Sequence, residues 1–174
     1  ARSAHLRSFK TWLFAAALAW LACTASWAHA ATTITVRDLV GRNVTVPHNP
    51  QRIVGIGAGT LRLLVYMQAA DRVVGVEDVE RNYLKGKPSK PYMTANPQLM
   101  QLPRVGPGGS NMTNKKPDYE DVLKAKPDVV FMTQMDPALA DEVQKTLGIP
   151  VVILSYGKTA GSFDEEIYSS LTLV

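Results

Sequence analysis

Four short runs of apolar, largely β-branched residues constrain the fold of this 174-residue chain more than any other feature. They occupy residues 52–57, 72–77, 128–133 and 150–156. None of them alternates apolar with polar residues, which is typical of parallel strands that are covered on both faces. Helix-like segments separate the first run from the second and the third from the fourth. The sequence therefore predicts an α/β, Rossmann-like βαβ lobe, in which ligands bind at the carboxyl ends of the strands.

The flanking segments complete this pattern. Residues 33–36 and 43–46 alternate around a turn, which predicts a β-hairpin before the first core strand. Three helices are expected from their caps and stop signals: one from Thr60 to about Ala70, one from near Pro117 to before Pro127, and one from Pro137 to Gly148 with Asp136 as its cap.

A long segment from Asp78 to Pro117 is rich in Pro, Gly, Lys and Asn residues, and only residues 104–106 in it suggest a brief strand. A connection of this length inside a compact domain is usually functional or disordered, and here it would pass over the carboxyl edge of the sheet. Its aromatic and polar side chains suit the rim of a binding site. The alternative is a solvated surface loop whose lysines face water.

Residues 161–174 predict a further helix. Ser162 and Glu165 fit a capping box, and an apolar stripe continues through Ile167 and Leu171 to Val174. No stop signal follows this stripe. We therefore expect the helix to continue into structure beyond this chain.

The first thirty residues have the pattern of an export signal. Three basic residues precede an apolar stretch at 12–23, and the Ala-His-Ala sequence at 28–30 suits signal peptidase. The apolar stretch is short for a membrane span. A lipoprotein would be anchored through Cys23, but Trp20 stands where an aliphatic residue is typical. We expect residues 1–30 to be a signal peptide, with cleavage before Ala31 and export to the periplasm.

Without this signal the chain is nearly neutral and poor in reactive side chains. Three of the 19 Lys and Arg residues lie in the signal, which leaves 16 against 15 Asp and Glu residues, so a nucleic-acid partner has no electrostatic support. The single cysteine also lies in the signal, and the one remaining histidine is His48, in a turn-rich segment. A zinc site, a cysteine nucleophile and the common hydrolase motifs are therefore excluded. We expect no catalytic residues, no metal site and no cofactor.

Six short motifs follow one another along residues 31–174. They are Asp38-Leu-x-Gly-Arg-x-Val-Thr-Val-Pro47, Pro50-x-Arg-Ile-Val54, Gly59-Thr-Leu-Arg-Leu-Leu64, Asp71-Arg-Val-Val-Gly-Val76, Glu120-x-Val-Leu-x-x-Lys-Pro-Asp-Val-Val130 and Leu147-Gly-Ile-Pro-Val151. Together they resemble the iron-siderophore and vitamin B12 class of periplasmic binding proteins, which serve ABC importers. The resemblance implies two α/β lobes joined by a helix, with the amino-terminal lobe at residues 31–160 and the start of the inter-lobe helical region at 161–174.

The resemblance also places a ligand between the lobes, against the loops at the strand ends and the long segment. The corresponding positions of this chain are Ala58, Gly59, Thr60, Glu77, Tyr92, Met93, Gly108, Gly109, Gln134 and Tyr156. We expect the ligand to be an iron-siderophore or a related metal chelate or corrinoid, and haem or an oxyanion such as molybdate is also compatible. The helix start at Thr60 offers backbone N–H groups that suit an anionic group. The protein is expected to act as a monomer.

Glu120 is the position that the resemblance assigns to docking. It lies eight residues before the Asp of the Lys-Pro-Asp motif, where the family carries an acidic residue that meets arginines of the permease, which works with its ATPase. A carboxylate in the first turn of a helix is also favourable for its dipole. The alternative interpretation is therefore an ordinary surface glutamate.

Two other function classes remain open. A dinucleotide-binding enzyme is suggested by Gly55, Gly57 and Gly59 between a strand and a helix, with Glu77 at the place of a ribose-binding acid. Against it, Thr60 replaces the last glycine of the motif, and the signal lacks the paired arginines of the folded-protein export route. An exported binding or scaffold module without a role in transport is the other class.

Overall fold

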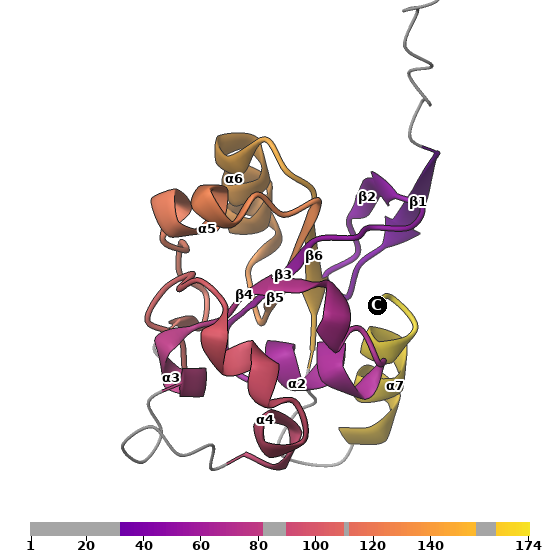
Figure 1. Ribbon diagram of the computed structural model, residues 1–174. Coiled ribbons are helices and arrows are strands. Elements are labelled where there is room, and N and C mark those ends of the chain that lie inside the picture. Colours follow the sequence, from indigo (N-terminus) through magenta and orange to yellow (C-terminus); the bar gives the residue numbers. More distant parts are fainter. Residues whose placement is uncertain (1–31, 82–89, 110–111, 156–162) are drawn as a thin grey trace, which may run out of the picture. The chain divides into compact units, whose positions relative to one another are not determined.

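The computed structural model describes residues 32–81, 90–109, 112–155 and 163–174, and these confirm the predicted α/β fold (Figure 1). The main sheet consists of four parallel strands: β3 (Ile53–Ile56), β4 (Val73–Gly75), β5 (Val129–Thr133) and β6 (Val151–Leu154). Their order in the sheet is β4-β3-β5-β6. The predicted hairpin forms a separate antiparallel pair, β1 (Thr33–Arg37) and β2 (Asn43–Pro47).

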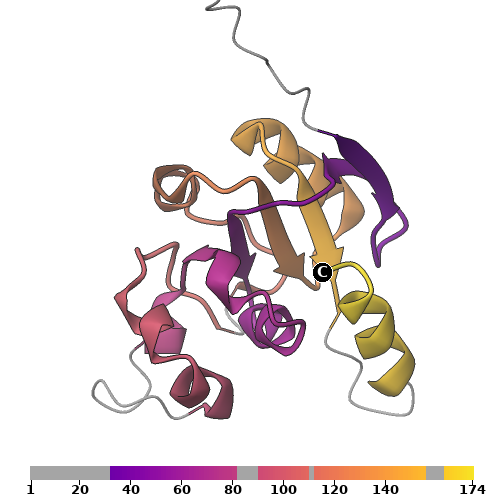
Figure 2. The ribbon, with the colours of Figure 1, turned by 45° about the vertical axis from the view of Figure 1, so that its right-hand side comes forward.

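The main sheet is covered on both faces, as its continuous apolar strands predict. Successive residues of β5 point alternately into two apolar clusters: Val129 and Phe131 into the first, Val130 and Met132 into the second. The first cluster also takes side chains from α2 (Thr60–Tyr66), α4 (Pro91–Ala95), the 3-10 helix η2 (Pro97–Gln101) and α7 (Phe163–Leu171). The second takes them from α5 (Tyr119–Ala125) and α6 (Pro137–Leu147), and Figure 2 shows these two helices across the sheet from α2.

Two helices start and stop where their caps predict. The Asp136 carboxylate accepts hydrogen bonds from two backbone N–H groups of the first turn of α6, and Gly148 ends that helix at a φ of 66°. Asp118 caps α5 in the same way and accepts from the Asp121 N–H. Within the described ranges, no helix is long and apolar enough to cross a membrane.

The first helix differs from its prediction at both ends. Gly59, with a φ of 79°, is the residue before α2, and Thr60 is the first helical residue rather than the cap. The helix stops at Tyr66 rather than near Ala70, because Gln68 adopts a left-handed φ of 59° that cannot continue it. The spacing of hydrophobic residues, which predicts the helix, carries no information about the backbone angles of a single residue such as Gln68.

The long segment is more helical than expected. It contains α3 (Asp78–Arg81), α4 and η2, and Pro91 and Pro97 open the last two of these. The expected strand at 104–106 is a single bridge between Val76 and Arg104. At the other end of the chain, α7 stops at Leu171 instead of continuing to Val174, and the predicted capping residue Ser162 lies outside the described residues.

A buried ion pair ties the hairpin turn to the last strand of the main sheet. The Asp38 side chain is fully buried, and its Oδ2 atom lies 2.8 Å from Arg42 Nη2. The same carboxylate accepts the Ile153 N–H, while Leu39 N–H donates to the Ile153 carbonyl. Arg42 also donates to the Val151 carbonyl. The Asp-Leu-x-Gly-Arg motif therefore has a structural role.

A second set of bonds fixes the amino ends of β3 and β5. The Asp128 carboxylate accepts the backbone N–H groups of Gln51 and Arg52, both at 2.9 Å. The Arg52 guanidinium in turn donates to the carbonyls of Ala125 and Lys126, where α5 ends. The sequence motifs at residues 50–54 and 120–130 are thus bonded to each other at the amino ends of these strands. The ligand is expected at the opposite, carboxyl ends.

The Asp38 ion pair should make a large contribution to stability. We expect Asp38→Asn to lower the free energy of unfolding by about 3 kcal/mol, because it leaves the largely buried Arg42 guanidinium with only the exposed Asp141 carboxylate as a countercharge. Urea denaturation followed by circular dichroism measures this. Asp141→Asn is the control, since Asp141 also pairs with Arg42 but its side chain is 68% exposed, and it should cost less than 1 kcal/mol. Equal losses for the two variants would contradict the assignment.

Candidate functional site

A cavity of about 490 Å³ lies at the carboxyl end of β3. Its lining comes from two parts of the chain: the turn and first helix that follow β3, and the segment that opens α4. The lining residues are Ala58, Gly59, Arg62, Tyr66, Lys90, Pro91 and Tyr92. The cavity therefore offers backbone from a glycine turn, two cationic side chains and two tyrosines.

The glycine turn after β3 is tight because two threonine side chains are packed behind it. Gly57 has a φ of 91°, and a Cβ atom there would lie 2.9 Å from Thr133 Oγ1. Thr60 is fully buried, and its hydroxyl donates to the Ile56 carbonyl at 2.7 Å and contacts Thr133. Thr60 therefore holds the turn from behind and keeps its side chain away from the cavity.

Arg62 brings a positive charge into the cavity from α2. Its Nε atom is buried and has no hydrogen-bond partner among the described residues. Tyr66 lies one helical turn further along the same face and is 59% exposed. A buried guanidinium nitrogen without a partner is unfavourable, and an oxygen atom of an anionic ligand would satisfy it.

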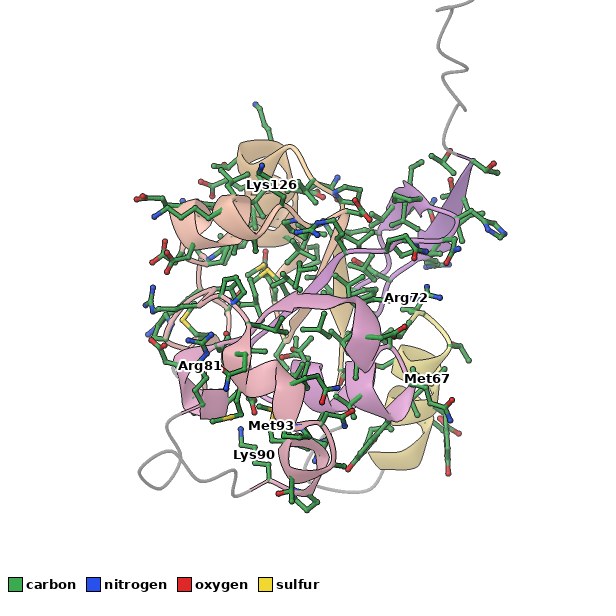
Figure 3. All side chains as sticks on the ribbon, viewed as in Figure 1. Met67, Arg72, Arg81, Lys90, Met93 and Lys126 are labelled. Atoms are coloured by element: carbon green, nitrogen blue, oxygen red, sulfur yellow. The ribbon has the colours of Figure 1, made fainter. Side chains whose placement is uncertain are left out.

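The opposite wall is held by a buried carboxylate. Glu80, in α3, is 4% exposed, and its Oε2 atom accepts from Lys90 Nζ and from the Tyr92 hydroxyl, both at 2.8 Å. Figure 3 labels Lys90 where α4 begins and Met93 further along that helix. Burial raises the pKa of Tyr92, and the adjacent Glu80 carboxylate raises it further, so the phenol remains protonated.

Glu77 lies behind the turn rather than in the cavity. It is 3% exposed, and its Oε1 atom accepts the Gly57 N–H at 2.9 Å. Gly108, at a φ of 76°, covers it so closely that a Cβ atom there would lie 2.6 Å from Glu77 Cβ. Burial raises the pKa of Glu77 from 4.5 to about 7, an effect opposed by the Gly57 N–H and reinforced by the neighbouring Glu80.

The structure brings together only part of the predicted ligand set. Ala58, Gly59 and Tyr92 line the cavity. Thr60, Glu77 and Gly108 support the turn behind it, and Met93 is fully buried in the first apolar cluster. The other three predicted positions do not line the cavity within the described residues: Gly109 follows Gly108, Gln134 follows β5 with a φ of 53°, and Tyr156 lies outside the described residues.

Arg62, Tyr66, Lys90 and Glu80 are the residues that sequence reasoning missed. Arg62 and Tyr66 share one face of α2 at a spacing of four residues, which a helical projection starting at Gly59 could have indicated. Lys90 would be a solvated lysine only under the alternative interpretation of the long segment. Its contact with Glu80 joins two segments that no local pattern relates.

Glu120 lies away from this cavity, in the first turn of α5. Its side chain is 78% exposed and forms an ion pair with Lys124 Nζ at 2.7 Å, one turn further along the helix. The expected exposure is therefore observed.

The lining of the cavity is suited to holding an oxygen-rich anion. In the described ranges, no group of three or more His, Cys, Asp and Glu residues could hold a metal. Among the described residues, the polar side chains that line the cavity are two cations and two phenols, and the carboxylates of Glu77 and Glu80 are engaged behind the wall. The fold and this site together define an α/β ligand-binding lobe.

Comparison with known proteins agrees with this class. The family described as "Periplasmic binding protein" matches residues 53–174, and the chain belongs to that family. The molybdate-binding protein MolA of Haemophilus influenzae is 32% identical over 120 residues, which cover 69% of this chain and 31% of MolA. The chain thus spans about a third of the length of this relative. The resemblance found in the sequence is confirmed.

Solved structures share the fold. MolA of Haemophilus influenzae with bound molybdate superimposes with a TM-score of 0.60 at 26% identity, over 80% of this chain and 43% of that one. A periplasmic solute-binding protein of Veillonella parvula gives 0.54 at 24% identity, over 73% and 36%. The petrobactin-binding protein YclQ of Bacillus subtilis gives 0.55 at 18% identity, over 82% and 44%.

The buried Glu77 predicts a pH dependence of stability. Its pKa is higher in the folded protein, about 7, than its ordinary value of 4.5, so the folded state holds this proton more tightly than the unfolded state. The free energy of unfolding should therefore fall as the pH rises from about 4.5 to 7, by about 3 kcal/mol from this group. In Glu77→Gln, which keeps an acceptor for Gly57 and carries no charge, this loss should disappear.

Urea denaturation at a series of pH values compares the two proteins. Asp78→Asn is the control, because Asp78 is adjacent in sequence but pairs with Arg104 on the surface. Its profile should keep the decline seen in the wild-type protein. A decline of the same size in Glu77→Gln would show that another group is responsible.

Proposed function

We propose that this protein is the substrate-binding component of an ABC importer, located in the periplasm, and that it captures an anionic metal chelate or metal oxyanion. The observation that carries this proposal is the cavity at the carboxyl end of β3, with Arg62 and Lys90 facing it. Its volume lies within the range of small-molecule sites. The described chain forms one wall of the site, and in the proposal a second lobe supplies the other.

The two ligand classes receive support from different observations. The sequence resemblance supports an iron-siderophore or a related chelate or corrinoid. The relative MolA is named for molybdate, and the cationic lining fits an oxyanion equally well. A corrinoid without acidic groups fits the lining less well, because it offers Arg62 no charged partner.

The competing enzyme function loses its main support. A dinucleotide-binding enzyme needs the acid at the end of the second strand to face a ribose. Here Glu77 is 3% exposed, its Oε1 atom is bonded to the Gly57 N–H, and Gly108 covers it. This acid is occupied in holding the turn, so a binding function without covalent chemistry is favoured.

Arg62 should be essential for affinity. We expect Arg62→Gln in the full-length protein to weaken binding of an anionic ligand at least tenfold, because a hydrogen bond to a charged group contributes about 1.5–3 kcal/mol. Isothermal titration with molybdate, ferric citrate, haem and cobalamin would identify the class. Arg72→Gln is the matched control, since Arg72 lies apart from Lys90 in Figure 3 and donates to Asn49. Binding of none of the four, or equal affinity in Arg62→Gln, would contradict the proposal.

The proposal includes docking through Glu120. Its exposed carboxylate lies on α5, on the face of the sheet opposite α2 and Arg62, so docking and ligand capture would use different surfaces. The protein would act as a monomer that delivers its ligand to a permease and its ATPase. Recognition there would rest on charge complementarity with arginines of the permease.

Glu120→Lys should therefore impair uptake while ligand affinity stays within twofold of wild type. A reversed charge costs several kcal/mol against permease arginines, whereas an exposed substitution costs folding about half a kcal/mol. Uptake is measured in cells lacking the native binding protein. Glu142→Lys is the control, because Glu142 is an exposed acid of α6 that also pairs with a lysine. Normal uptake by Glu120→Lys would contradict the docking role and leave Glu120 as an ordinary surface glutamate.

A further inference from the structure

Glu80 lies behind the cavity and acts on it through two side chains that line it. One carboxylate oxygen, Oε2, accepts hydrogen bonds from Lys90 Nζ and from the Tyr92 hydroxyl, both at 2.8 Å. Glu80 is 4% exposed and does not line the cavity, whereas Lys90 and Tyr92 do. Glu80 would therefore affect a ligand in the cavity only through its influence on the charge and the hydrogen bonds of Lys90 and Tyr92.

The two cations of the cavity are in unequal states. Lys90 has a buried countercharge at ion-pair distance, so its field in the cavity is largely cancelled. Arg62 approaches from α2, and in the part of the chain that the structure describes its Nε atom has no acceptor. The wall thus has two cationic side chains but presents about one uncompensated positive charge.

The Tyr92 hydroxyl is similarly committed. It donates its hydrogen bond to Glu80. The Tyr92 oxygen can therefore act toward the cavity only as an acceptor, and the hydroxyl cannot donate to an anion. The second buried carboxylate nearby, Glu77, accepts the Gly57 N–H, and the Lys90 charge acts on it through space, whereas Glu80 is at hydrogen-bond distance from Lys90. Glu80 is therefore the group that fixes what Lys90 and Tyr92 can offer.

We propose that Glu80 is a positioning residue that sets the charge selectivity of the cavity. It cancels the charge of Lys90 and accepts the hydrogen bond of the Tyr92 hydroxyl, so that Arg62 alone meets the negative charge of the ligand. The inference rests on the proposed function, because it concerns the same site, and it specifies a preference for ligands of low negative charge. Without Glu80 the same wall would favour ligands of higher charge.

Two tetrahedral anions of similar size test this selectivity. Molybdate carries two negative charges and perrhenate one, so the ratio of their affinities reports the positive charge of the site. In the full-length protein, Glu80→Gln should raise the molybdate-to-perrhenate affinity ratio roughly fivefold, the effect of one added charge at about 4 Å in a solvated site. Lys90→Gln should leave the ratio lower than in Glu80→Gln, and the double variant Glu80→Gln/Lys90→Gln should restore the wild-type ratio.

Glu142→Gln is the matched control, because it frees Lys116 at the surface in the way that Glu80→Gln frees Lys90. It should leave the ratio unchanged. Circular dichroism melting confirms that each variant is folded. An unchanged ratio in Glu80→Gln, or a parallel loss of affinity for both anions, overturns the proposal. Either outcome would mean that Glu80 supports the cavity wall but does not set its charge selectivity.

A second measurement needs no ligand and separates this inference from the proposed function. The rate at which acetic anhydride modifies Lys90, followed by mass spectrometry, should rise severalfold in Glu80→Gln, while Lys124 serves as an internal reference. No change in the Lys90 rate overturns the assignment of Glu80. If the wild-type protein binds neither anion while the Lys90 rate rises, the oxyanion class of the proposed function fails and the neutralisation of Lys90 by Glu80 stands.

Discussion

The pairing of β3 with β5 is the constraint on which the rest of the structure depends. Ile53 lies opposite Val129 and Ile56 opposite Met132, so both strands end at the same level. Their amino ends are fixed by the Asp128 and Arg52 bonds, and their carboxyl ends bring Gly57 against Thr133. Because each strand is buried on both faces, a slip of one residue would exchange the two apolar clusters. The position of the glycine turn, and hence of the cavity, follows from this register.

The segment after β4 joins the two halves of the cavity lining. Glu77 and Glu80 are three residues apart, yet one binds the turn after β3 and the other binds the start of α4. Buried carboxylates are costly without partners, and both here are satisfied by groups that shape the site. The geometry of the cavity wall is therefore set by two residues that do not themselves line the cavity. This explains why its two sides, which are far apart in the sequence, can hold a fixed spacing.

The sequence was informative where structure is local and repetitive. Continuous apolar runs predicted the four parallel strands, and Asp136 with Gly148 predicted the limits of α6. It was less informative where a tertiary contact overrides local preference, as at Gln68, whose left-handed backbone shortens α2. Within the site, the glycine turn and Tyr92 followed from topology and resemblance. Arg62, Lys90 and Glu80 did not, because the value of a charged side chain depends on which other charge faces it across the fold.

The Asp38 turn has a consequence for the outer side of the main sheet. β6 is an edge strand, and such strands expose unpaired N–H and C=O groups that can recruit another polypeptide. Here Leu39 donates to the Ile153 carbonyl, Asp38 accepts the Ile153 N–H, and Arg42 takes the Val151 carbonyl. A three-residue patch of side chains and backbone thus closes the edge without adding a strand. These contacts occupy the backbone groups with which a strand of another molecule would pair, and so they protect the folded lobe against aggregation.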